Sequence, residues 1–172
     1  MGELERVMDI DIKLLVRDIA NQIISDLQKN IRDKRVTEFG PMNNTGEAAA
    51  SLRWKIEEGN LVIYSTMPGF NYIMTLETGR KPGRMPPVEP IQRWMQQRGI
   101  VPRDISQESL AFLIARRIGR EGSKVYREYT KTGKGTGILL DVIGNRQYIK
   151  DNVITPIVNK LTERFIEQMQ TV

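Results

Sequence analysis

The sequence contains no histidine and no cysteine among its 172 residues. Ser-His-Asp catalysis, catalytic thiols, disulfide bonds and zinc sites that use histidine or thiolate ligands are therefore excluded. The usual general base at neutral pH is also absent. The chemistry that remains open is that of carboxylate, lysine and tyrosine side chains.

The carboxylates do not occur at spacings that suit catalysis or metal binding. Asp9 and Asp11 are separated by one residue, which places them on different faces of a helix. Glu57 and Glu58 fall at an expected hairpin turn, where solvent would surround them. No group of Asp, Glu and Lys has the spacing of a nuclease. We therefore expect no enzymatic activity, no metal site and no cofactor.

The segment Lys131–Gly137 resembles a phosphate-binding loop. With Gly133 and Lys134 as its Gly-Lys pair, the P-loop motif requires glycine at position 128 and Ser or Thr at position 135. The sequence has Glu128 and Gly135 there. Nucleotide binding is therefore not expected.

Positive charge is concentrated in two segments in the middle of the chain. The net charge is +5, from 26 basic and 21 acidic residues. Residues 80–103 hold six bases against one acid, and residues 116–134 hold seven bases against two acids. Such segments are typical of a surface that binds phosphates or an acidic partner. They are equally typical of solvated faces that keep a protein soluble, and both interpretations stay open.

Residues 90–99 and 106–122 are predicted to form two consecutive helices, the second rich in arginine. Arg116, Arg117 and Arg120 lie off the apolar stripe of this second helix, as in a helix-turn-helix recognition helix, and are the candidate contacts to DNA or an acidic partner. The linker of about six residues is longer than the usual tight turn. This length favours an ordinary helical hairpin with a charged outer face.

The elements that would position these residues begin with a long N-terminal helix, predicted from Leu4 to about Arg35. Its apolar residues recur at steps of three and four, and no glycine or proline after Gly2 interrupts them. The stripe consists of Met8, Ile12, Leu15, Ile19, Ile23, Leu27 and Ile31. Such a helix can lie across its own sheet or pack against a neighbouring subunit.

A β-hairpin is predicted from Leu52 to Ser65, with its turn at residues 58–60. One face of this hairpin is apolar and must be covered, and the long helix is the obvious cover. Residues 37–46 are predicted to be a loop because of their breaker residues, and Glu47–Ala50 a short helical turn.

A short helix is predicted over residues 70–77, ending at Gly79 in a left-handed cap. Residues 80–90 are basic and rich in proline, which predicts an extended arm without regular structure. Pro90 is predicted to open the next helix, which Gly99 ends. The arginine-rich helix is expected to begin after Ser106 as its N-cap and to end at Gly122.

Residues 122–137 are predicted to be the most flexible stretch, with residues 126–129 extended. Residues 138–143 are apolar and fit either a strand or a turn of helix. A last helix is predicted from about Asn145 to Met169, with a kink or a restart at Pro156 and Thr155 as the new cap. Its apolar residues recur every four positions: Ile149, Val153, Ile157, Leu161, Phe165 and Met169.

The length suits one compact domain over residues 1–172, since domains cluster near ~100–150 residues. We divide it into an N-terminal helix (1–36), a core of hairpin plus helices (44–122), a flexible loop (122–145) and a C-terminal helix (146–170). No apolar run approaches the ~18–20 residues of a membrane span, and the polar, acidic N-terminus lacks the features of a signal peptide. We expect a soluble product of the cytosol that does not associate with membranes.

Several motifs, taken in order, resemble the tail-completion (neck) proteins of tailed bacteriophages. The first is Asn44-Thr45-Gly46 followed by Ser51-Leu52 and the hairpin, and the second is Tyr72–Gly79, which fits a Tyr…Glu-x-Gly pattern before a proline-rich stretch. The segments Pro86–Trp94, Arg98-Gly99-Ile100 and Ala111–Gly122 are similar to a subgroup of these proteins. The resemblance covers roughly residues 44–122.

The resemblance implies an α+β fold, in which a small antiparallel sheet is packed by a long N-terminal helix and C-terminal helices. It implies a structural protein without enzymatic activity that forms a ring in the head–tail connector, between portal and tail and around the DNA channel. The expected partners are copies of the same chain, the portal or adaptor ring and tail proteins of the virion, with non-specific contact to genomic double-stranded DNA. The expected location is the head–tail junction of the virion, after assembly in the host cytoplasm.

On this interpretation the irregular segments order against neighbouring subunits. Residues 66–90 and 122–137 are then contacts within or between rings, and deletion of residues 130–137 is expected to impair assembly while the monomer stays folded. Three apolar members of these loops would be exposed in an isolated monomer. The candidate contacts are Met67, Phe70, Arg80, Lys81, Arg84, Met85, Lys131 and Lys134, the apolar ones being Met67, Phe70 and Met85.

Two other functions are compatible with the sequence. A free DNA-binding module would use the three arginines and would lose affinity steeply as salt rises. An antitoxin-like or chaperone-like interaction protein is suggested by the long first helix alone.

Overall fold

The computed structural model describes residues 3–37, 40–41, 45–67 and 71–170. The fold is α+β, as the resemblance implied, and it is mostly helical with two antiparallel pairs of strands. In chain order the elements are α1 (Glu3–Asp33), β1 (Arg35–Thr37), β2 (Gly40–Pro41), α2 (Glu47–Ala50), β3 (Leu52–Glu57), β4 (Asn60–Ser65), α3 (Asn71–Thr78), α4 (Val88–Gln97), α5 (Gln107–Glu121), α6 (Lys124–Thr132), α7 (Leu140–Ile143), α8 (Arg146–Ile149), the π-helical turn η1 (Lys150–Ile154) and α9 (Thr155–Gln170).

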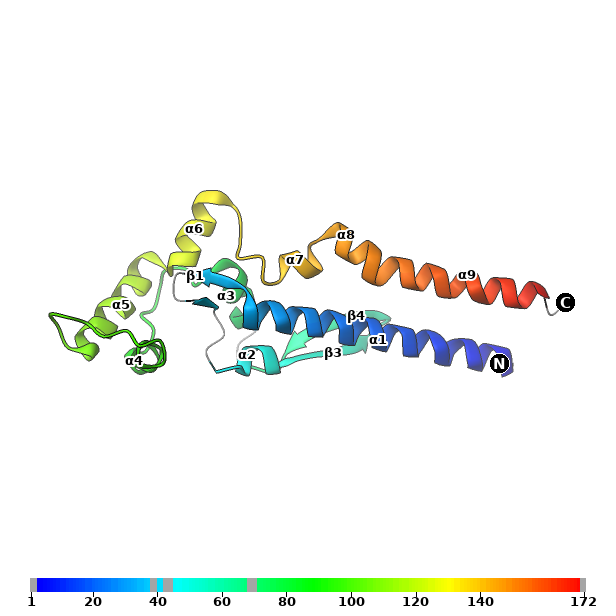
Figure 1. The fold of residues 1–172 in the computed structure, drawn as a ribbon, viewed down its shortest axis with the longest axis horizontal. Helices are drawn as coiled ribbons and strands as arrows, with labels where there is room; N and C mark the ends of the chain where they lie inside the picture. Colours follow the sequence, from blue (N-terminus) through cyan, green and yellow to red (C-terminus); the bar gives the residue numbers. More distant parts are fainter. Residues whose placement is uncertain (1–2, 38–39, 42–44, 68–70, 171–172) are drawn as a thin grey trace.

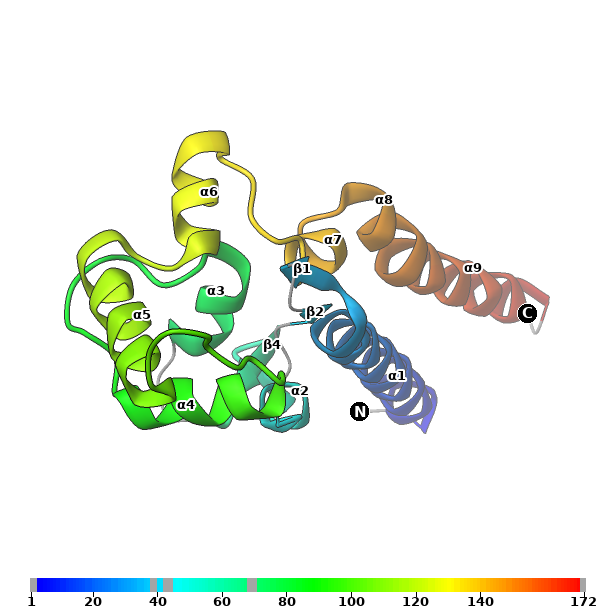
Figure 2. The same ribbon diagram turned by 60° about the vertical axis from the view of Figure 1, so that its left-hand side comes forward.

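The molecule is elongated (Figure 1). Helices α3 to α6 lie at one end, and α1 and α9 extend from the middle towards the other end, where both chain termini lie (Figures 1 and 2). The two long helices run in opposite chain directions. None of the described helices is long and apolar enough to cross a membrane.

Helix α1 covers its own hairpin. Ile19, Ile23, Leu27 and Ile31 are buried along one stripe, as their spacing predicted. The indole N–H of Trp54 on β3 donates a hydrogen bond to Asn21 Oδ1 of α1 at 2.9 Å. The prediction of a long helix lying across its own sheet is therefore confirmed for this part of α1.

The hairpin has the predicted bounds, and its register runs from Leu52 opposite Ser65 to Glu57 opposite Asn60. Glu58 and Gly59 form a two-residue turn, with φ of 51° and 79°. Positive φ at both central residues is the signature of the turn that matches the twist of paired strands. The short helix α2 also has its predicted bounds and buries Ala48 and Ala49.

One prediction for residues 37–46 is wrong, because part of this segment pairs as strands β1 and β2. Arg35 lies opposite Pro41, and Thr37 opposite Gly40. Strands of three and two residues are too short to show alternation in the sequence. Proline is tolerated here because β2 is an edge strand.

The main core joins α1 to the hairpin, α2, α3 and the segment around α7. Its buried members are Ile19, Ile23, Leu27, Ile31, Ala48, Ala49, Leu52, Leu76, Ile138, Leu139 and Val142. A separate small cluster lies where α4 packs on α5. There Met95, Ala111 and Ala115 are fully buried, and the two alanines allow the helices to approach closely.

Helices α3 to α5 follow the sequence prediction with one exception. Gly79 (φ 77°) ends α3, and Ser106 caps α5 by accepting a hydrogen bond from the Ser109 N–H at 3.0 Å. Helix α4, however, begins at Val88, so Pro90 lies inside its first turn rather than opening it. The amides of the first turn have no intrahelical partner, so proline costs little at this position.

The prediction of a flexible stretch with residues 126–129 extended is wrong. These residues form α6, which Ser123 caps by accepting from the Tyr126 N–H at 3.2 Å, and Gly133 (φ 68°) ends it. The prediction failed because Gly122 and Gly133 flank this helix, although its own residues include neither glycine nor proline.

Residues 140–143 form the helix α7 rather than a strand. Asn145 caps α8 as expected, by accepting from the N–H groups of Gln147 and Tyr148. The predicted new cap at Thr155 is wrong, since its φ of −59° and ψ of −46° are helical. The helix instead continues through the π-helical turn η1, which rearranges the hydrogen bonds just before Pro156.

Candidate functional site

The carboxylate of Glu77 holds the segment that follows α6. Glu77 is only 1% exposed. Its Oε1 accepts a hydrogen bond from the Gly137 N–H at 2.8 Å, and its Oε2 accepts from the Leu139 N–H at 2.7 Å. The Glu77 carbonyl also accepts from the Thr136 N–H at 2.8 Å. The acidic residue of the Glu-x-Gly motif is therefore a buried anchor for a loop about 60 residues away in sequence.

Gly79, the other end of this motif, lies against the start of α6. A Cβ at Gly79 would be 2.2 Å from the backbone nitrogen of Tyr126, so no other residue fits without displacing α6. Next to it, Ser123 Oγ accepts a hydrogen bond from the Arg80 N–H at 2.9 Å, and the Ser123 N–H donates to the Arg80 carbonyl at 2.8 Å. The end of α3 thus fixes the segments on both sides of α6.

The proline-rich arm packs on α5 within the same chain. The Gly83 N–H donates to the Gly119 carbonyl at 2.8 Å, and a Cβ at Gly119 would be 3.1 Å from Met85 Cα. Arg80 Nη2 donates to the Arg84 carbonyl at 3.0 Å. The arm and the loop after α6 are therefore ordered by their own chain, which corrects the expectation that they gain their shape against neighbouring subunits.

The three apolar loop residues proposed as contacts differ in their surroundings. Met67 is partly buried against the main core, so the expectation that a monomer exposes it is wrong. Met85 is 41% exposed, as expected. Phe70 lies outside the described residues.

The proposed basic contacts are all exposed, and α4 to α6 lie together at one end of the molecule (Figure 2). They lie on the arm, along α5 and at the end of α6, so the fold brings together the two basic segments of the sequence. The residues are Arg80, Lys81, Arg84, Arg116, Arg117, Arg120, Lys131 and Lys134.

Arg117 is not a free cation in this group. Its Nε donates to Glu121 Oε2 at 2.9 Å, and Arg127 lies 3.6 Å from the same oxygen. The hydrogen bond from Arg117 lowers the pKa of Glu121 below its usual range. Arg116 and Arg120 are exposed on the same helix, so they are better placed than Arg117 to meet phosphates or an acidic partner.

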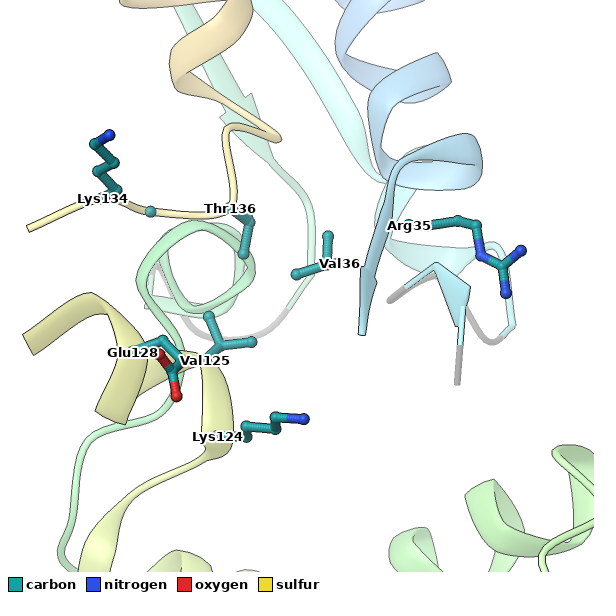
Figure 3. Close-up of a pocket in the computed structure, with 8 residues that line it drawn as sticks. Arg35, Val36, Lys124, Val125, Glu128, Lys134 and Thr136 are labelled. Atoms are coloured by element: carbon teal, nitrogen blue, oxygen red, sulfur yellow. The ribbon is translucent and has the colours of Figure 1, made fainter. Parts of the chain in front are cut away.

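A pocket of about 280 Å³ lies between β1, α6 and the loop after α6. Figure 3 shows Val36, Val125 and Thr136 towards its middle, whereas Arg35 and Lys134 extend away from it. Because the charged groups do not converge on one point, the pocket does not form a catalytic constellation.

The described residues contain no group of three acidic side chains that could hold a metal ion. Asp9 and Asp11 are both within α1. Glu57 and Glu58 are exposed at the hairpin turn, as expected, and Glu57 Oε1 accepts from Lys55 Nζ at 2.9 Å.

Helix α9 has an exposed apolar face that was not predicted from the sequence. Val153 and Ile157 pack against the core, but Leu161, Phe165 and Met169 from the same repeat are exposed. A strict four-residue repeat advances about 40° around a helix at each step, so it cannot keep to one side. The exposed apolar residues from η1 to the end of α9 are Ile154, Val158, Leu161, Phe165, Ile166 and Met169.

An apolar groove of about 200 Å³ was also not predicted. It lies between the hairpin, α1, α3 and the α7 segment, so residues far apart in sequence line it. These are Leu27, Leu52, Ile63, Tyr64, Ser65, Ile73, Met74, Leu139 and Ile143.

No protein-family model, curated protein or solved structure matches this chain. The functional conclusion therefore depends on the motifs and on the surfaces described above.

Proposed function

We propose that this protein is a structural component of a tailed-bacteriophage virion, which forms a ring in the head–tail connector between portal and tail and around the DNA channel. The observation that best supports assembly is the exposed apolar face of α9. Six large apolar side chains are exposed between Ile154 and Met169. A contiguous apolar surface of this kind is unusual for a monomer and is typical of a protein–protein interface.

The motifs behind the resemblance have structural roles in this chain, which supports a shared architecture. Gly46 precedes α2 with a φ of 81°, and Leu52 is buried in the core. Ser51 Oγ donates to the Ala48 carbonyl at 2.7 Å and lies 2.8 Å from Ser65 Oγ, so it joins α2 to the hairpin. Glu77 and Gly79 join α3 to the segments around α6.

The charge distribution suits a position beside DNA or an acidic neighbour. The two basic segments of the sequence lie on the arm and on α4 to α6 at one end of the molecule, and α9, with its exposed apolar residues, extends towards the opposite end (Figure 1). A ring could therefore use one part of each subunit for assembly while another part faces phosphates.

Imaging of purified particles of the phage that encodes the chain tests this function. We expect density for a ring of this fold at the head–tail junction, and we expect a mutant lacking the protein to give heads that do not join tails. Absence of the protein from particles, together with normal particles from the mutant, would overturn the proposal.

A stand-alone DNA-binding module is a second candidate, favoured by the exposure of Arg116 and Arg120 on α5. Two arginine–phosphate contacts, from Arg116 and Arg120, predict a loss of affinity of roughly 12-fold between 50 and 200 mM salt. Replacing Arg116 and Arg120 by alanine should then lower the logarithmic salt slope by about two, whereas the control Arg146→Ala on α8 should not. Tight, salt-sensitive duplex binding by the purified chain that these two arginines control would favour this second function.

A further inference from the structure

A second groove, which we call the α5 groove, lies between the start of α4 and the first turns of α5. Its volume is about 440 Å³. Phe112 is 45% exposed and Leu113 is 49% exposed, so the groove presents large apolar side chains to solvent. The residues that line it are Val88, Ile105, Glu108, Ser109, Phe112 and Leu113.

The α5 groove continues into a basic surface along the same helix. Leu113, Arg116 and Arg120 are spaced by three and four residues, so they share one face of α5. The two arginines lie about 4.5 and 10.5 Å from Leu113 along the helix axis, at ~1.5 Å per residue. Both arginines are exposed. An occupant of the groove that extends along α5 therefore meets two cations.

The proline-rich arm adds its charge to this surface. The arm runs beside α5 before it reaches α4 (Figure 2). The Gly83 N–H donates to the Gly119 carbonyl at 2.8 Å, and a Cβ at Gly119 would be 3.1 Å from Met85 Cα. Arg84 lies between these two contacts in the chain, so its backbone is held beside the last turns of α5.

Bases outnumber acids on this part of the molecule. Residues 80–87 and 114–121 contain six bases and one acid, Glu121. Glu121 Oε2 already accepts from Arg117 Nε at 2.9 Å and lies 3.6 Å from Arg127 Nη1. One carboxylate cannot neutralise the remaining bases, so the surface stays positive beside an apolar groove. The complementary partner is acidic as well as apolar.

The lining of the α5 groove favours a protein segment over nucleic acid. Phe112 is the one aromatic side chain among the lining residues, whereas single-stranded nucleic acid is bound by successive stacking aromatics. The exposed carboxylate of Glu108 repels phosphates from the groove itself. A peptide can place a neutral apolar side chain in the groove and its own carboxylates a turn away, beside the arginines.

We infer that the α5 groove and the adjoining basic surface bind a helical segment of another protein, which carries a large apolar side chain and, one and two turns away, acidic side chains. Bound helices present anchors at this spacing when they lie in a groove. The apolar side chain enters the groove, and the acids lie against Arg116 and Arg120. The inference goes beyond the ring function and does not require it, and the lysines at the end of α6 are not part of this surface.

A synthetic helical peptide tests the assignment on the full chain. The probe is a capped, fluorescent peptide of alanine and glutamine with phenylalanine at its centre. It carries glutamate one and two turns away on each side, so that either chain direction fits the surface. One control peptide has alanine at the centre, and the other has glutamine in place of the glutamates. Fluorescence anisotropy should show that each control binds about 10-fold more weakly than the probe, and that salt weakens the probe alone.

Variants of the chain locate the bound surface. The double substitution Arg116→Gln with Arg120→Gln should weaken binding of the probe about 10-fold or more and remove most of its salt dependence. Phe112→Ala should weaken it about 10-fold, because the groove loses its largest apolar side chain. Leu113→Ser serves as a second groove variant if Phe112→Ala lowers the melting temperature.

Matched controls lie on other elements. Arg146→Gln with Lys150→Gln removes two exposed bases from α8 and η1, and Phe165→Ala removes an exposed phenylalanine from α9. Each control should change binding of the probe less than about 2-fold, since neither surface adjoins the α5 groove.

Other results overturn the inference in distinguishable ways. Absence of probe binding at millimolar peptide, or binding that survives both sets of α5 variants, means that this surface does not take such a segment. Equal binding of the probe and the alanine-centred peptide means that charge alone is recognised. A DNA duplex or single strand that binds more tightly than the probe, and depends on the arginines but not on Phe112, assigns the surface to nucleic acid. Particle imaging decides the ring function separately in each case.

Discussion

At the scale of single residues, Glu77 belongs to the Glu-x-Gly motif and stabilises the fold by binding backbone amides. Its carboxylate satisfies two backbone N–H groups that would otherwise be buried without acceptors. A carboxylate that accepts from backbone amides makes stronger hydrogen bonds than a neutral group does. The acidic residue of the Glu-x-Gly pattern is therefore explained without any catalytic role.

Replacing Glu77 by alanine should lower the free energy of unfolding by about 2–4 kcal/mol, because it leaves the amides of Gly137 and Leu139 without their acceptor. Urea denaturation measures this loss. The control Glu163→Ala removes an exposed carboxylate on α9 and should change stability by less than about 0.5 kcal/mol. Equal effects of the two substitutions would contradict the anchoring role.

Tyr148 and Asp26 form a second long-range contact, in which Tyr148 Oη donates to Asp26 Oδ2 at 2.5 Å and joins α8 to α1. Burial raises the pKa of Tyr148, and the hydrogen bond to Asp26 raises it further. The pKa in the folded state is therefore higher than the ordinary value near ~10 of the unfolded chain. The contact should stabilise the fold fully below pH 10 and progressively less as the pH rises above it.

The substitution Tyr148→Phe tests this pH dependence. At pH 7 it should lower the free energy of unfolding by about 1 kcal/mol through loss of the hydrogen bond. Between pH 10 and 11 the difference in the free energy of unfolding between wild type and variant should narrow. In this range Tyr148 keeps its proton in the folded wild type and loses it on unfolding, which favours the unfolded state, and the variant has no such group. Thermal melting across this range measures the gap, and a gap that stays constant with pH would show that Tyr148 does not titrate as described.

At the scale of elements, two glycines with nearly the same backbone conformation have very different surroundings. Gly79 has φ 77° and Gly59 has φ 79°. A Cβ at Gly59 would meet nothing within 4 Å, whereas one at Gly79 would overlap the backbone of Tyr126.

Substitution of each glycine by alanine separates backbone strain from crowding. Gly59→Ala should lower the free energy of unfolding by about 1–2 kcal/mol, because alanine is strained in the left-handed conformation. Gly79→Ala should lower the free energy of unfolding by clearly more than this, because the new methyl group also forces α6 to move away from α3. Chemical denaturation of the two variants measures the difference, and equal losses would mean that α6 is not held against α3.

The contacts of the loop after α6 change the result expected from the deletion of residues 130–137. Residues 130–137 include Thr136 and Gly137, whose amides bond to Glu77, so their deletion should destabilise the monomer. The earlier expectation of a folded deletion mutant does not fit these contacts. The double substitution Lys131→Ala with Lys134→Ala keeps the backbone, and we expect its melting temperature to stay within about 3 °C of the wild type. A folded deletion mutant would contradict the anchoring of this loop.

The elements that could be predicted are those marked by patterns within their own residues or by capping residues at their ends. Apolar spacing predicted α1, alternation predicted the hairpin, and Ser106 with Gly122 delimited α5. Helix α6 was missed because glycines surround it, and the pairing of β1 with β2 because the strands are too short. The groove and the Glu77 anchor could not be predicted, since both join segments that are distant in sequence.

At the scale of the whole molecule, the arm, α5 and α6 lie at one end, and α9 with its exposed apolar residues extends towards the other end (Figure 1). The arm and α5 bring parts of the two basic segments, residues 80–103 and 116–134, into contact, because the Gly83 N–H donates to the Gly119 carbonyl and the Ser123 N–H to the Arg80 carbonyl. In the proposed ring, this arrangement would give each subunit one surface for its neighbours and another for phosphates. Which neighbours these are is the question that particle imaging answers.

The four-residue repeat that spirals around α9 also implies an order of events. Its early members, Val153 and Ile157, are occupied as soon as the chain closes its own core. Its later members, from Leu161 onward, continue along the same helix, so the docking of Val153 and Ile157 on the core sets the direction in which they face. A chain that has not yet closed its core would not present these residues in a fixed orientation, so in the proposed ring the joining of subunits would have to follow folding.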